Sequence, residues 1–169
     1  VTFLAANPPF QGPNWLSAQE AALRLITWTF CLHLLREADS TSESRVRALS
    51  EAIAVHAERI PPTLIYARSQ NNNHLLSETA GLITAATALP NHPRAKKWIS
   101  LGRKWFNRGL EKQIDGYGEY SQHSTNYHRL MLQLALWENS LTTKDTKGHK
   151  EFSFTPLARK NLVRASHWL

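Results

Sequence analysis

The chain has 169 residues, of which 42% are hydrophobic and 20% are charged, and this composition is typical of a folded globular protein and excludes a disordered one. Its formal net charge of +7 predicts a basic surface that attracts polyanions such as acidic polysaccharides or nucleic acids. No run of eighteen apolar residues occurs, so we expect no membrane span, and the length favours a single domain.

Apolar periodicity, capping residues and prolines predict six helices in chain order, after an extended arm over residues 1–16. Ser17 and Glu20 form a capping box that opens the first helix, and a second box covers residues 40–43. Polar residues 142–151 are expected to form a loop, and the last helix is expected to continue to Leu169. The expected helices cover residues 17–37, 40–60, 73–89, 93–114, 122–141 and 155–169.

The six helices alternate in character. The first, third and fifth are apolar nearly all round, so each should be covered on several sides, whereas the second, fourth and sixth have one polar face. Short connections make consecutive helices antiparallel neighbours. The pattern predicts an all-α fold, an incomplete α/α toroid of helical hairpins that forms one domain over residues 1–169. A truncated ring exposes apolar surface, so we expect self-association through its open edge.

Two polar segments stand at the starts of the third and fifth helices, over residues 70–78 and 124–128. They combine amides, imidazoles and a phenol, which suit the binding of an anionic substrate. If the odd-numbered helices are parallel, their N-termini meet at one rim, where free N–H groups also favour an anion. The sequence therefore predicts a functional site at this rim.

The two segments read, in order, Asn72-Asn73-His74 with Glu78 and Gly81-Leu82, and then Asp115-Gly116, Ser124 and Tyr127-His128. In this order and spacing they are similar to motifs of the heparinase II/III-type polysaccharide lyases. The resemblance covers roughly residues 10–169. It implies an incomplete toroid, a β-sandwich domain that is absent from this chain, and cleavage of uronic-acid polysaccharides such as glycosaminoglycans or alginate by β-elimination. We expect the full-length protein to be periplasmic or secreted.

The resemblance assigns the catalytic roles to Asn73, His74 and Tyr127. The Asn73 amide and the His74 imidazole would neutralise the uronate carboxylate while charge develops on it, as in an oxyanion hole. A phenol carries its proton at neutral pH, so Tyr127 would protonate the leaving O4 as a general acid. The base is either Tyr127 itself, assisted by histidines, or a group from the missing domain. No metal site and no cofactor are expected on this chain, although the missing domain often carries a metal.

A further set of residues is expected to bind the substrate, and each member also has a simpler structural interpretation. The asparagines could cap a helix, the histidines could lie in the core, Trp15 could be a buried anchor instead of a sugar platform, and Arg68 could be an ordinary surface residue. The set comprises Asn72, Glu78, Gln122, His123, His128, Trp15 and Arg68.

The leading alternative is a non-catalytic helical module that binds acidic polymers, either glycans or nucleic acids. Lys97, Lys104, Arg108 and Lys112 form a basic row on the fourth helix. No aromatic residue interleaves this row, so it is interpreted as a solvated outer face. The expected partner is therefore an acidic polysaccharide and not a nucleic acid.

Overall fold

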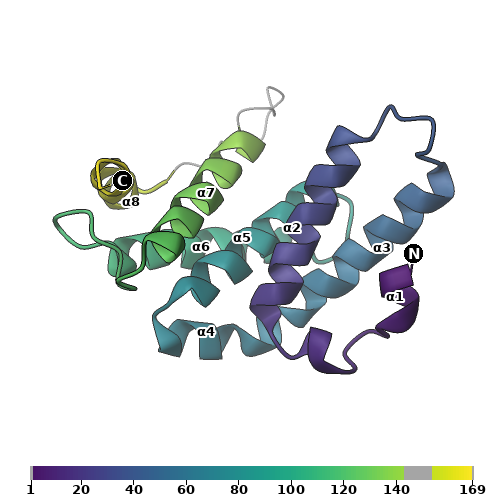
Figure 1. Cartoon of the computed structure of the whole chain (residues 1–169), viewed down its shortest axis with the longest axis horizontal. Coiled ribbons are helices and arrows are strands. Elements are labelled where there is room, and N and C mark those ends of the chain that lie inside the picture. The colour runs from purple at the N-terminus through teal and green to yellow at the C-terminus, as the bar shows by residue number, and fades with distance from the viewer. Residues whose placement is uncertain (1, 143–153, 169) are drawn as a thin grey trace.

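The computed structural model describes residues 2–142 and 154–168, and this part of the chain is all-helical apart from one isolated bridge between Ile114 and Tyr120 (Figure 1). Two short 3-10 helices, η1 (Pro13–Trp15) and η2 (Pro61–Thr63), separate longer elements. The α-helices are α1 (Thr2–Ala6), α2 (Ala18–Leu34), α3 (Glu43–Arg59), α4 (Leu64–Gln70), α5 (Asn73–Ala88), α6 (Ala95–Gln113), α7 (Thr125–Thr142) and α8 (Pro156–Ser166).

The helices form two layers, as predicted. Helix α5 lies between α2 and α7, and these three form the inner layer. Helix α3 packs against α2, α6 packs against α5, and α8 packs against both α6 and α7. This arrangement confirms the all-α fold that the sequence predicts. Of the three inner helices, only α5 is covered on nearly all sides, whereas α2 and α7 expose large apolar residues such as Leu34 and Leu136.

Helix α5 is the centre of the molecule, because every residue from 75 to 86 is buried. Gly81 lets α2 approach closely: a Cβ atom at this position would lie 2.7 Å from the Cβ of Ala22. On the opposite side, Phe106 of α6 and Met131 of α7 belong to the same buried cluster as the α5 side chains. Helix α5 therefore holds its N-terminus in a fixed place between its two inner neighbours.

The structure corrects three of the predicted boundaries. Residues 1–16 are not wholly extended, because they contain α1 and η1. Helix α4, which precedes α5, was not predicted, and α8 ends at Ser166 instead of continuing to Leu169. The two missed helices have five and seven residues, which is too short for a 3.6-residue period to be recognised.

Serine or threonine side chains cap α2, α3 and α8. Ser17 accepts a hydrogen bond from the backbone N–H of Glu20, as the first capping box predicts. The second cap is Ser42 and not Ser40, so α3 begins later than expected. Thr155 caps α8. The loop expected over residues 142–151 lies, after Thr142, outside the described residues.

Helix α2 is less covered than its composition predicts. Phe30 and Leu34 in its last turns are exposed, Leu34 by 71%, and so is Cys31. These turns border a cavity of about 670 Å3 between the C-terminal ends of α2, α5 and α7. Self-association through this edge stays a prediction.

Candidate functional site

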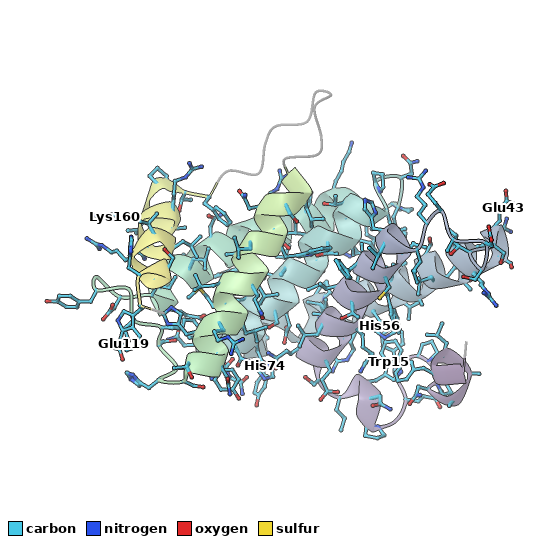
Figure 2. All side chains as sticks on the ribbon, turned by 45° about the horizontal axis from the view of Figure 1, so that its top comes forward. Trp15, Glu43, His56, His74, Glu119 and Lys160 are labelled. Carbon is cyan, nitrogen blue, oxygen red and sulfur yellow. The ribbon has the colours of Figure 1, made fainter. Side chains whose placement is uncertain are left out.

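Hydrogen bonds join the N-termini of the three inner helices along one rim. The Gln19 amide of α2 donates to Ser77 Oγ of α5 at 3.1 Å. Before α7, the Gln122 side-chain oxygen accepts from the backbone N–H of Asn73 at 2.8 Å. Figure 2 shows the labelled Glu119, His74 and Trp15 along this edge of the molecule. The predicted meeting of the three N-termini at one rim is confirmed.

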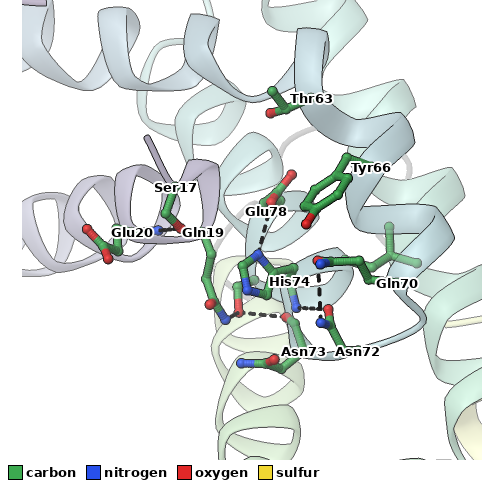
Figure 3. A network of polar contacts seen from close by, with 12 residues as sticks. Ser17, Gln19, Glu20, Thr63, Tyr66, Gln70, Asn72, Asn73, His74 and Glu78 are labelled. Carbon is green, nitrogen blue, oxygen red and sulfur yellow. Dashed lines mark hydrogen bonds and ion pairs between the residues drawn. The ribbon is translucent and has the colours of Figure 1, made fainter. Parts of the chain in front are cut away.

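The three consecutive asparagines at the start of α5 have different roles. Asn71 ends α4 in the left-handed conformation, with φ 49°, which asparagine tolerates better than most residues. Asn72 is the N-cap, and its side-chain oxygen accepts from the N–H of His74 at 3.0 Å. Asn73 begins the helix, and its side-chain amide has no hydrogen-bond partner among the described residues (Figure 3). Asn73, which is 8% exposed, therefore begins the helix with an amide that makes no hydrogen bond within the described structure and can bind a ligand.

Two buried polar side chains, Gln113 and Tyr120, fix the backbone at the start of α5. The Gln113 amide donates to the backbone carbonyl of Asn72 at 2.9 Å, and the Tyr120 hydroxyl donates to the Gln113 side-chain oxygen at 3.0 Å. Burial raises the pKa of Tyr120 well above its ordinary value. Tyr120 therefore stays protonated and serves as a structural donor that fixes the backbone at Asn72.

His74 and Glu78 lie one helical turn apart, with His74 Nδ1 3.7 Å from a Glu78 carboxyl oxygen (Figure 3). Burial lowers the pKa of His74, and burial raises the pKa of Glu78 to about 8, an effect that the charge of Arg59 partly opposes. Both shifts favour the uncharged forms at neutral pH, and 3.7 Å is too long for a strong hydrogen bond. The contact is therefore a neutral pair that a bound anion can polarise, and not an ion pair.

Glu78 should make the folded protein less stable as the pH rises. Between the ordinary value of 4.5 and about 8, the unfolded chain has lost a proton that folded Glu78 retains. The free energy of unfolding should therefore fall by ~1.4 kcal/mol per pH unit in this interval. Glu78→Gln is uncharged throughout and should be more stable than the wild type at pH 8.5, with little difference near pH 5, in urea denaturation.

The matched control is Glu37→Gln, which changes an exposed glutamate. Its unfolding curve should follow that of the wild type at every pH. Buried Glu138, whose pKa is also raised, titrates in the same direction but is present in all three proteins and cancels in the comparison. A difference between Glu78→Gln and the wild type that is the same at pH 5 and 8.5 would refute the assignment.

Tyr127 lies in the first turn of α7, at the same end of the molecule as Asn73. Gln122, three residues before α7 begins, fixes this proximity through its contact with Asn73. The Tyr127 side chain is 42% exposed. Its phenol is therefore accessible to a ligand at the rim.

Trp15 is buried, and Arg68 is exposed but has one face of its guanidinium covered. Trp15 is buried, with its ring centroid 4.3 Å from that of His56, which favours the anchor interpretation over a sugar platform. Arg68 of α4 stacks on Trp105 of α6, with its guanidinium carbon 3.6 Å from the ring centroid. Its flat face is therefore occupied by a side chain of the outer layer.

The two histidines near the start of α7 lie in different environments. His123 is exposed, and its Nδ1 lies 2.7 Å from a Glu119 carboxyl oxygen. His128 is buried, and its Nε2 donates to the backbone carbonyl of Ala165 at 2.9 Å. A carbonyl only accepts, so this nitrogen carries the proton. His123 lies at the rim, whereas His128 ties α7 to α8.

Three rim residues were missed from the sequence. Gln19 lies between Ser17 and Glu20 of the first capping box, which gives no signal of a second role. Tyr66 lies on the unpredicted α4, where it is 62% exposed near His74 and Gln70 (Figure 3). Trp168 was assigned to a continuing helix but lies beyond the end of α8. For Tyr66, the only available signal was an aromatic residue shortly before the asparagines.

Within residues 2–142 and 154–168, the structure contains no group of three or more histidine, cysteine or acidic side chains that could hold a metal ion. In the same ranges, no helix combines the length and the apolar character needed to cross a bilayer.

Comparison with known proteins gives one family and one distant relative. The family model described as heparinase II/III N-terminus matches residues 10–159. A heparin-sulfate lyase of Bacteroides thetaiotaomicron is 29% identical over 80 residues, which cover 47% of this chain and 11% of that protein. The matched stretch is thus a small part of that relative. No solved structure matches the chain.

Proposed function

Because the chain belongs to the heparinase II/III family, we propose that it is the helical part of a polysaccharide lyase that cleaves a uronate-containing acidic polysaccharide by β-elimination. The observation that carries the proposal is the Asn73 amide, which has no partner in the described structure and stands beside uncharged His74 at the inner-helix rim. The heparin-sulfate lyase relative makes heparan sulfate the first substrate to test.

Carboxylate neutralisation is the first requirement of this reaction, because removal of the C5 proton puts more negative charge on the uronate. The Asn73 amide donates to a carboxylate oxygen, and the N-terminus of α5 adds positive partial charge. An anionic ligand also favours the protonated form of His74, which then contributes a full charge. These groups stabilise the transition state more than the bound substrate, because the negative charge on the uronate is largest there.

Protonation of the leaving oxygen is the second requirement. A base, either Tyr127 itself or a group outside this chain, takes the C5 proton. As the C5–H electrons form the C4–C5 double bond, the C4–O4 bond breaks and O4 needs a proton. Tyr127 supplies it, because its exposed hydroxyl lies on the helix next to the carboxylate site. The carboxylate-binding groups and the proton donor thus lie at the starts of two neighbouring helices, α5 and α7.

The test is to incubate the chain with heparan sulfate and to follow the ultraviolet absorbance of the unsaturated uronate. The proposal predicts a steady increase that is lost on boiling the protein. Binding of heparan sulfate by this chain without any increase in absorbance would instead support the non-catalytic polymer-binding module.

A further inference from the structure

A second, smaller cavity lies next to the rim, between the segment that precedes α7 and the residues that follow α8. Gln122 lines this cavity and also accepts the hydrogen bond from the Asn73 N–H. The volume is about 170 Å3, below the ~300–1,000 Å3 of pockets that enclose a drug-sized ligand. The size suits one sugar unit of a longer chain whose neighbouring unit lies at Asn73.

One wall of the cavity is the indole of Trp168, which is 51% exposed. The ring stacks on His128, with centroids 5.9 Å apart and an interplanar angle of 22°. His128 is itself held by the Ala165 carbonyl and by an edge contact with buried Tyr120. A half-exposed indole fixed in this way offers a rigid apolar face with a polar edge, as a sugar ring requires.

The polar lining of the cavity indicates the charge of the ligand. Glu119 brings a carboxylate, which is paired with His123, and Ser124 and Thr125 bring hydroxyls. None of the described lining residues is a lysine or an arginine. Such a lining binds sugar hydroxyls but disfavours a sulfate or a second carboxylate, because Glu119 would repel it.

We propose that this cavity is a subsite for an uncharged sugar unit next to the uronate, with Trp168 as its stacking platform. The inference rests on the proposed function, because Asn73 and His74 fix where the uronate lies. In this proposal the cavity takes the sugar that is linked to O4 of the uronate, so recognition depends on chain length. A disaccharide with the uronate at its non-reducing end occupies only the rim, whereas a tetrasaccharide also fills the cavity.

Calorimetric titration of heparan-sulfate disaccharides and tetrasaccharides tests this subsite. All proteins carry Tyr127→Phe, so that the sugars are not consumed. Trp168→Ala should weaken tetrasaccharide binding about tenfold and disaccharide binding less than about twofold. Trp168→Phe keeps an aromatic face and should retain most of the affinity. The control is Tyr117→Ala, which removes an 88% exposed aromatic residue that lies in the loop between α6 and α7 and does not line the cavity.

Equal losses for both sugar lengths, or equal behaviour of Trp168→Ala and Tyr117→Ala, would overturn the subsite. If Trp168→Ala lowers the melting temperature, His123→Ala takes its place with the same length-dependent expectation. Absence of binding by either sugar would overturn the subsite and the proposed function together. Length-dependent binding without any elimination by the unsubstituted protein would leave the subsite standing and reject the lyase proposal.

Discussion

Tyr127→Phe should reduce the elimination rate by about 10²–10⁴-fold while the affinity for heparan sulfate stays nearly constant. The change removes only the phenolic hydroxyl, which the proposal uses to protonate O4 and which acts mainly in the transition state. The side chain is 42% exposed, so the substitution should alter the free energy of unfolding by less than ~0.5 kcal/mol. Initial rates from the ultraviolet absorbance, with calorimetry for binding, measure the two effects separately.

Tyr66→Phe is the matched control for this prediction. Tyr66 is also an exposed phenol near His74, but it lies on α4 and not on α7 (Figure 3). Its variant should keep the wild-type rate within about threefold, because the proposal gives its hydroxyl no proton to transfer. A large rate loss in Tyr66→Phe with an unaffected Tyr127→Phe would move the general acid to α4 and reject the present assignment.

The rim could be predicted from the sequence because helix polarity is encoded in local signals. Ser17 and Thr155 cap their helices where expected, and short connections force neighbouring helices to be antiparallel. Because consecutive long helices run in opposite directions, every second one points the same way. The N-termini of α2, α5 and α7 therefore lie at one end. The family resemblance then singled out Asn73, His74 and Tyr127 on this rim, and their catalytic roles stay a proposal.

The environment of each side chain could not be predicted, because it depends on which neighbours cover it. Trp15 and Phe30 are both large aromatic residues next to apolar ones. Trp15 is buried against His56 of α3, whereas Phe30 is exposed. Similarly, no local pattern reveals that Glu78 is buried and uncharged, because its burial results from tertiary packing around α5. Trp168 contributes to a cavity only because the chain turns back on His128.

Asn73→Asp should reduce the elimination rate by at least about 10²-fold and should also weaken substrate binding. The substitution replaces a donor with an acceptor of negative charge at the point where the proposal places the uronate carboxylate. The repulsion acts on the ground state and on the transition state, so kcat and KM should both deteriorate. Asn73→Ala, which removes the donor without adding charge, should lose rate by a similar factor but retain more of the affinity.

Asn73→Asp should lower the elimination rate and the affinity while the protein stays folded, so a loss of activity through unfolding can be excluded. Asn73 is the first residue of α5, where a negative charge interacts favourably with the helix dipole by ~0.3–1 kcal/mol. This interaction opposes the desolvation cost of a carboxylate at a position that is 8% exposed, so the variant should remain folded. Asn126→Asp makes the same charge change in the exposed first turn of α7 and controls for general repulsion of a polyanion. If Asn126→Asp weakens binding and slows elimination as much as Asn73→Asp, the effect is one of net charge, and Asn73 has no special role toward the carboxylate.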